Sequence, residues 1–278
     1  MRRQLIFLIC LSALSAQGQY DSLAFWAHGS LHDSVARLRL QHGNKLQTAL
    51  LDSLEANGPE STAKDFPYQN IMTQWSDDGR LVTFTFAVPV ENGMYQFMGA
   101  VASRGRKRSA SYIVTPLAGH SLQAPNGNRI LNDHTSSRPG SHNCGIVYDI
   151  LTVKHRRQTQ YVALVYYPAA GSQHYQSKVV EPIIIGRRGI YFGASVFDVP
   201  VFNDRIFRRP AMRLTMHYST SHAASLRSDQ NGQIIIENVV PLRGAPVGMY
   251  KLYGPTLGED VLRFQKGRWA MEKVPVSP

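Results

Sequence analysis

Cysteine is almost absent from this chain, which holds only Cys10 and Cys144. Cys10 lies in an apolar run near the amino terminus that we expect to be removed on export. A mature chain whose single cysteine is Cys144 cannot form an internal disulfide, so a disulfide-stapled scaffold is excluded. The roughly 260 residues that remain can bury about 70–75% of the unfolded chain's surface without such help.

Long apolar runs are also scarce, and the clearest one marks an export signal. Arg2 and Arg3 precede an apolar stretch at residues 5–14, and small residues including Ala16 and Gly18 follow it. This layout is typical of a secretory signal peptide, here residues 1–18, with cleavage after Ala16 or Gly18. The sequence therefore predicts an exported protein.

The scarcity of long apolar runs also bears on whether the exported chain spans a membrane. No later stretch approaches 18 uninterrupted apolar residues, so we expect a periplasmic or extracellular protein that is soluble after cleavage, without a transmembrane helix. A lipid anchor at Cys10 is the alternative. Ile9 disfavours it, because lipoprotein processing prefers a small residue at that position.

Acidic residues are outnumbered, with 19 Asp and Glu against 30 Lys and Arg and a net charge of +11. Loss of Arg2 and Arg3 lowers this by two, to +9. The excess favours an anionic polymer or lipid surface as partner, and export argues against nucleic acid. Alternatively, the basic residues only keep hairpin tips solvated, because they cluster at predicted turns. The clusters are Arg104, Arg106, Lys107 and Arg108; Lys154, Arg156 and Arg157; Arg187 and Arg188; and Arg208 and Arg209.

Residues 19–65 are predicted to form a helical segment and linker. Ser30, three residues before Asp33, resembles a helix start, and Leu31, Val35 and Leu38 follow at helical spacing. A clearer helix is predicted from Asn44 to Asn57, with Gly58 and Pro59 ending it and residues 58–66 forming a loop. Its apolar face consists of Leu46, Leu50 and Leu54.

Residues 66–278 are predicted to form one large antiparallel β domain, sandwich- or barrel-like, so the fold class is mainly β with one or two N-terminal helices. Val82, Phe84, Phe86 and Val88 alternate along a strand, and Asn92-Gly93 is typical of a hairpin turn. Turns recur about every ten residues, as in sandwiches and barrels. Further strands are predicted at 94–102, 110–117, 145–153, 161–167, 178–185, 190–197, 213–218, 234–240, 249–253, 260–265 and 268–274, with a long loop at 118–143.

Nucleophile motifs are missing from the chain, so no catalytic residue is assigned. No G-x-S-x-G occurs, and Ser195 in FGASVF is predicted to have strands on both sides instead of the strand–turn–helix elbow of a serine hydrolase. His142 lies two residues from Cys144, but catalytic Cys–His pairs are usually brought together from distant positions. We expect Cys144 to be a buried structural residue.

Metal-ligand and carboxylate patterns are equally sparse, and we predict no metal site and no cofactor. The histidine pairs considered are His28 with His32, His217 with His222, and His134 with His142 near Asp133; none forms a compact set of three or four ligands. Asp77 with Asp78 and Glu259 with Asp260 resemble the acid pairs of glycosidases. Their positions beside glycines favour turn-supporting roles.

Strand aromatics give a separate indication of binding. Aromatic rings stack on sugars and fill interfaces, although most strand aromatics are core. The residues concerned are Trp75, Tyr191, Tyr218, Tyr250, Tyr253 and Trp269.

Several turn-and-strand phrases occur together in a recognisable order. MTQWSDDGRLVTFTF (72–86) resembles the S-x-D-G-R-x-R-x-F-x-W opening of an exported bacterial family without an assigned activity, although Phe86 stands where that family tends to have Trp. Segments 153–164, 185–197, 248–255 and 260–272 resemble it in the same order. The resemblance covers about residues 66–275 and implies a signal peptide, a helical N-terminal segment and a β-rich domain. It supplies no catalytic residue.

Two functions of different class follow from the sequence. The first is a non-enzymatic exported protein acting in envelope binding or structure, and the second is a hydrolase of an envelope or extracellular polymer. A flat aromatic or basic face would favour binding, whereas a deep pocket with converging His and carboxylate groups would favour the enzyme.

Overall fold

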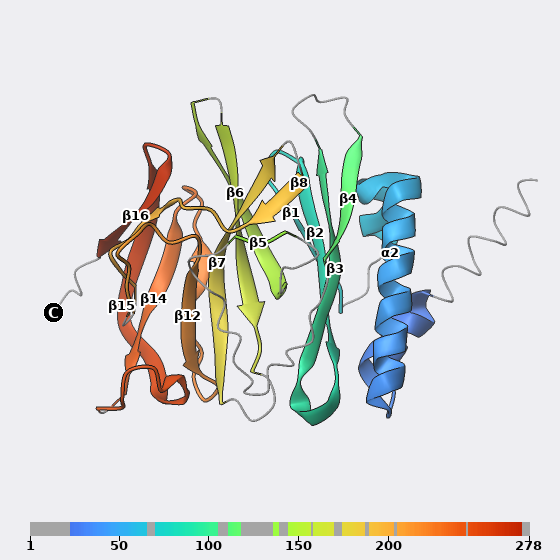
Figure 1. The fold of residues 1–278 in the computed structure, drawn as a ribbon, viewed down its shortest axis with the longest axis horizontal. Coiled ribbons are helices and arrows are strands. Elements are labelled where there is room, and N and C mark those ends of the chain that lie inside the picture. The colour runs from blue at the N-terminus through green and yellow to red at the C-terminus, as the bar shows by residue number, and fades with distance from the viewer. Residues whose placement is uncertain are drawn as a thin grey trace, which may run out of the picture.

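The structure, a computed structural model, describes residues 23–65, 70–104, 111–117, 136–138, 144–156, 158–169, 174–186, 189–202, 205–242 and 244–273. The predicted signal peptide, the boundary at residue 66 and all of the predicted 118–143 loop except residues 136–138 lie outside this part of the chain. The described residues are mainly β, with helices at the amino-terminal end followed by antiparallel sheets (Figure 1). The predicted fold class is confirmed.

Three large sheets and one short ribbon contain all the described strands. The first sheet is a meander of β1 (Met72–Trp75), β2 (Leu81–Pro89), β3 (Tyr95–Arg104) and β4 (Tyr112–Leu117). The second has the order β12 (Leu214–Ser219), β7 (Tyr175–Gly186), β6 (Gln158–Tyr167) and β5 (Ile146–His155), with β8 (Gly189–Phe192) paired to β7. The third runs β13 (Leu226–Ser228), β14 (Ile234–Pro241), β15 (Tyr253–Gln265), β16 (Arg268–Lys273) and β9 (Phe197–Asp198). The ribbon pairs β10 (Val201–Phe202) with β11 (Arg205–Ile206).

The sheets stack face to face, so the sandwich form of the prediction is the one observed. Figure 1 shows the order helix, first sheet, second sheet, third sheet across the molecule. One buried cluster joins the helices to the first sheet, a second joins the first and second sheets, and a third joins the second and third sheets. The second sheet is therefore covered on both faces, and every residue of its strand β12 is buried.

The predicted helix boundaries are wrong at three points. Ser30 does not start a helix: it lies buried inside helical residues 23–32, where its hydroxyl donates to the carbonyl of Ala27 at 2.8 Å. α2 (Ala36–Asp65) begins well before Asn44, which therefore does not cap it. The helical conformation is interrupted at Gly58 (φ 76°, ψ 167°), as predicted, but residues 59–65 are helical again where a loop is predicted.

The leucine face of α2 is buried as predicted. Leu46, Leu50 and Leu54 pack on the first sheet against residues that include Phe84 and Phe86 of β2. The earlier apolar spacing has a different outcome, because Val35 and Leu38 are exposed. Apolar residues at helical spacing therefore mark a buried helix face only where that helix packs on a sheet.

The β2–β3 hairpin follows its predicted turn. Asn92 and Gly93 both have positive φ, 57° and 67°, in the short 3-10 turn Glu91–Gly93, and the strands pair from Leu81 with Ser103 to Pro89 with Tyr95. A strand predicted at 249–253 is instead the 3-10 turn Tyr250–Leu252, followed directly by the long strand β15.

Candidate functional site

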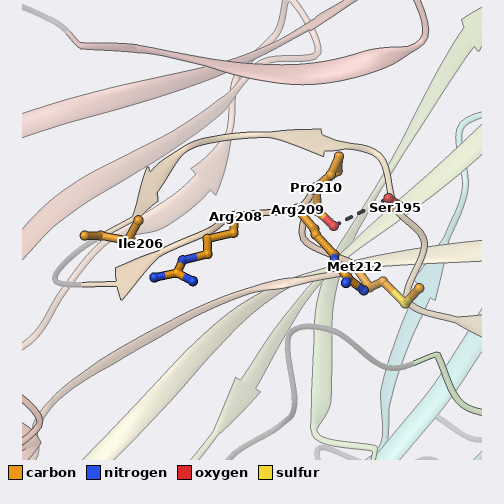
Figure 2. Close-up of a pocket in the computed structure, with 6 residues that line it drawn as sticks. All are labelled: Ser195, Ile206, Arg208, Arg209, Pro210 and Met212. Atoms are coloured by element: carbon orange, nitrogen blue, oxygen red, sulfur yellow. Dashed lines mark hydrogen bonds between the residues drawn. The ribbon is translucent and has the colours of Figure 1, made fainter.

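A surface hollow of about 570 Å³ lies in the segment between β8 and β12, two strands of the second sheet. Residues 193–213 contain β9, which joins the edge of the third sheet, and the β10–β11 ribbon, before the chain returns to the second sheet at β12. The hollow is open to solvent, and Figure 2 shows the side chains around it. They are Ser195, Ile206, Arg208, Arg209, Pro210 and Met212.

Buried aromatic side chains fix the shape of this segment. Phe197, Phe202 and Phe207 enter the core between the second and third sheets. Backbone contacts add to this: Phe207 N donates to Pro200 O at 2.9 Å, and β9 pairs with β16. Ile206, between Phe202 and Phe207, faces solvent and is 78% exposed.

Two arginines give the hollow its charge. Arg208 and Arg209 are both exposed, and among the described residues neither forms an ion pair. The sequence analysis placed them with basic residues at hairpin tips, whereas the structure places them on the loop after β11, beside a concave apolar surface of Ile206 and Met212. Guanidinium groups in such a position bind carboxylate, phosphate or sulfate groups in a two-pronged geometry.

Ser195 is the one hydroxyl that lines the hollow. It lies between β8 and β9, as predicted, and its Oγ donates to the carbonyl of Pro210 at 3.4 Å (Figure 2). A serine nucleophile instead needs a general base positioned to accept that proton. The lining therefore provides cations and apolar contacts but no proton acceptor for Ser195 chemistry.

Cys144 is buried between the first and second sheets, as expected. Burial raises the pKa of its thiol to about 12, so the thiol stays protonated at neutral pH. His142 lies outside the described residues.

The paired carboxylates have structural roles, as predicted. Asp78 accepts bonds from the Ser76 hydroxyl, the Arg80 amide and the Tyr161 hydroxyl, the last at 3.0 Å. Asp77 accepts from the amide of Thr152 at 3.2 Å. The turn thus ties the first sheet to the second.

The other acidic pair, Glu259 and Asp260, lies on β15 in the third sheet. Glu259 forms a two-pronged ion pair with Arg227, with a closest contact of 2.8 Å. Its carboxylate is therefore engaged on the outer surface of this sheet, where Glu237 lies directly across the β14–β15 pair.

The predicted histidine pairs do not assemble ligand sets in the described part of the chain. The rings of His28 and His32 lie 4.7 Å apart, and no group of three His, Cys, Asp or Glu suited to a metal ion occurs among the residues described. His217 is buried in β12, whereas His222 lies in the turn that follows it. His134 and Asp133 lie outside the described residues.

His217 belongs to a buried polar row that the sequence analysis did not identify. Its Nδ1 shares a 2.6 Å hydrogen bond with the hydroxyl of Ser177, directly across the β12–β7 pair, while Nε2 has no partner. Burial, aided by the Arg205 guanidinium, lowers the pKa of His217 to about 3. Four residues along the same two strands, Arg213 and Glu181 form a two-pronged ion pair at 2.7 and 3.0 Å.

The sequence signal for this row was the alternation in β12. Leu214 and Met216 face the third sheet. The residues that alternate with them along the chain, which include Arg213 and His217, therefore face the opposite side of the second sheet. That pattern is also expected of a strand with one solvated face. Only the pairing with β7 shows that these side chains are buried together.

The strand aromatics are mostly core, which removes them as an indication of sugar binding. Tyr218, Tyr253 and Trp269 are buried between the second and third sheets, and Tyr250 packs against the same cluster. Trp75 packs with the helices and the first sheet. Tyr191 is partly buried, 5.7 Å from the guanidinium carbon of Arg138.

No known protein family, no curated protein and no solved structure matches the chain. The resemblance of residues 72–86 to an exported family therefore stays a prediction. In the described residues, no helix combines the length and apolar character needed to cross a bilayer. The residues themselves, and above all the hollow with its two unpaired arginines, must support any functional assignment.

Proposed function

We propose that this is an exported, non-enzymatic protein of envelope binding or structure that holds an anionic polymer in the hollow at residues 195–212. The observation that carries the proposal is the position of Arg208 and Arg209, exposed and without ion pairs among the described residues, on the rim of a concave surface. The net charge of +11, or +9 without Arg2 and Arg3, draws anionic partners toward the protein.

The lining matches a polymer with both charged and apolar surfaces. Each guanidinium offers a planar fork to a carboxylate or sulfate. Ile206 and Met212 offer apolar contact to the faces of sugar rings between those charges. Because the hollow is open to solvent, a polymer chain can reach it from the surface.

Contacts elsewhere support binding over the hydrolase alternative. The groups that hydrolysis would need are engaged in structural roles: Cys144 is protonated in the core, Asp78 supports a turn and Glu259 is paired with Arg227. General acid–base catalysis requires such groups to converge on a substrate.

Calorimetric titration with heparin, a sulfated polysaccharide, and polygalacturonate, a carboxylated one, tests the proposal. The double variant R208S/R209S is expected to bind at least about tenfold more weakly, because a charge-assisted hydrogen bond contributes about 1.5–3 kcal/mol. The matched control is R37S/K45S, which removes the same charge from exposed positions on α2. Equal weakening by both double variants would show a nonspecific charge effect and reject the hollow as the site.

A further inference from the structure

The loop at residues 244–252, between β14 and β15, is held rigidly although its tip is apolar. Figure 1 shows that it joins the lower ends of these two strands. Several hydrogen-bonded turns follow one another in the loop, and the hydroxyl of Tyr253, at the start of β15, accepts a hydrogen bond from the middle of the loop. The bonds are Leu242 N to Leu252 O, Ala245 N to Leu242 O, Met249 N to Pro246 O, Leu252 N to Met249 O, and Gly248 N to Tyr253 Oη at 2.9 Å.

Tyr250 anchors the inner side of this loop to the second sheet. Its ring lies 4.3 Å from the ring of His217, 5.2 Å from that of Tyr253 and 5.6 Å from that of Tyr175, measured between centroids. An inward anchor of this kind fixes which side chains of the loop face outward. The loop is therefore formed before any partner arrives.

The outer side of the loop carries apolar side chains that nothing in the described structure covers. Val247 is 74% exposed, and Met249 and Leu252 are exposed beside it. Val240, on the last part of β14, is exposed as well. Surface apolar residues are unremarkable singly, but a group of them on a rigid protruding loop marks a contact surface.

The charges around the loop are of one sign. Between Pro241 and Gly258 the only charged residues are Arg243 and Lys251, and Lys251 is exposed without an ion pair among the described residues. Two acids farther along β14 and β15 are engaged: Glu237 accepts from Ser225 N at 2.7 Å, and Glu259 is paired with Arg227. Exposed apolar side chains next to Lys251 match the surface of a bilayer with anionic headgroups.

We propose that the 244–252 loop docks this protein on an anionic lipid surface. Val247, Met249 and Leu252 enter the boundary between headgroups and acyl chains, while Lys251 contacts the phosphates. This surface is separate from the polymer hollow, so the protein would connect an anionic polymer to the membrane. The membrane contact does not depend on the polymer function being right.

Vesicle cosedimentation of the exported, processed protein tests the docking. Binding is expected to vesicles that contain phosphatidylglycerol and to be much weaker with phosphatidylcholine alone. V247D is expected to bind about tenfold or more weakly, because the aspartate replaces a buried apolar side chain with a negative charge that anionic headgroups repel. I113D is the matched control, because Ile113 on β4 is also exposed, at 61%, but lies on the first sheet. R208S/R209S is expected to retain most vesicle binding while losing polymer binding.

A second measurement reads insertion directly. V247W should show a blue shift of its tryptophan emission when anionic vesicles are added, whereas I113W should not. Undiminished vesicle binding by V247D, or no spectral shift in V247W, would overturn the proposal. A dimer that V247D dissociates, together with no vesicle binding by the wild type, would also overturn it and assign the loop to contact between two copies of this chain.

Discussion

The outermost sheets at the two ends of the stack differ in what covers their outer faces. At one end α2 covers the first sheet, and Leu46, Leu50 and Leu54 extend the apolar core by a further layer. At the other end the third sheet exposes its outer face, on which Arg227 pairs with Glu259. Arg263 pairs with Glu272 across β15 and β16 at 3.0 Å.

This difference shows two solutions to the same physical problem. A sheet with two apolar faces must be covered on both, and a helix with one apolar face can end the series. A sheet can also end the series itself if its last face carries charges, which stay solvated and discourage further stacking. The helical end is therefore expected to contribute strongly to stability and the charged end only weakly.

The largest expected effect is at the helical end. Leu50 is fully buried against the first sheet, so Leu50→Ala should lower the free energy of unfolding by about 2–5 kcal/mol through lost burial and the cavity left behind. Urea unfolding followed by circular dichroism measures this. A loss below about 1 kcal/mol would mean that α2 is not docked as described.

The second sheet, between the two ends, should respond to pH. The unfolded chain protonates His217 near its ordinary pKa, but burial holds the folded pKa near 3, so below about pH 6 the unfolded state binds more protons. Stability should therefore fall as pH drops from about 6 to about 3, with this residue contributing up to about 1.4 kcal/mol per pH unit. Urea unfolding at several pH values should show a shallower decline for His217→Gln. An equal decline of the free energy of unfolding with pH in the wild type and in His217→Gln would contradict burial of a neutral imidazole.

The smallest effect is expected at the charged end. Arg263 and Glu272 are each about half exposed, so Arg263→Ala should change the free energy of unfolding by about 0–1 kcal/mol. Raising the salt concentration should reduce even that difference. A loss as large as that of Leu50→Ala would remove the contrast between the two ends.

The sequence predicted the strands well because their apolar residues and turns are local signals. The alternation of Val82, Phe84 and Phe86 correctly identified β2, but it left open that Thr83 and Thr85 are buried too. Both faces of the first sheet are covered, by α2 on one side and the second sheet on the other. Coverage depends on elements distant in sequence, so periodicity within one strand cannot reveal it.

The candidate site was less accessible to prediction for a related reason. Arg208 and Arg209 were recognised as a basic pair, but their place on the rim of a hollow follows from Phe202 and Phe207 being anchored in a core made by other strands. The row of Ser177, His217, Glu181 and Arg213 likewise depends on the β7–β12 register. Side-chain capping at Ser30 and Asn44 was misjudged because those residues lie inside helices.

The salt dependence of polymer binding tests the central claim most directly. If Arg208 and Arg209 hold the anionic groups, the logarithm of the heparin association constant should fall with the logarithm of salt concentration. The slope for R208S/R209S should be shallower than that of the wild type by about two ionic contacts, whereas R37S/K45S should keep the wild-type slope. Identical affinities and slopes for wild type and R208S/R209S would contradict the assignment of the hollow as the polymer site.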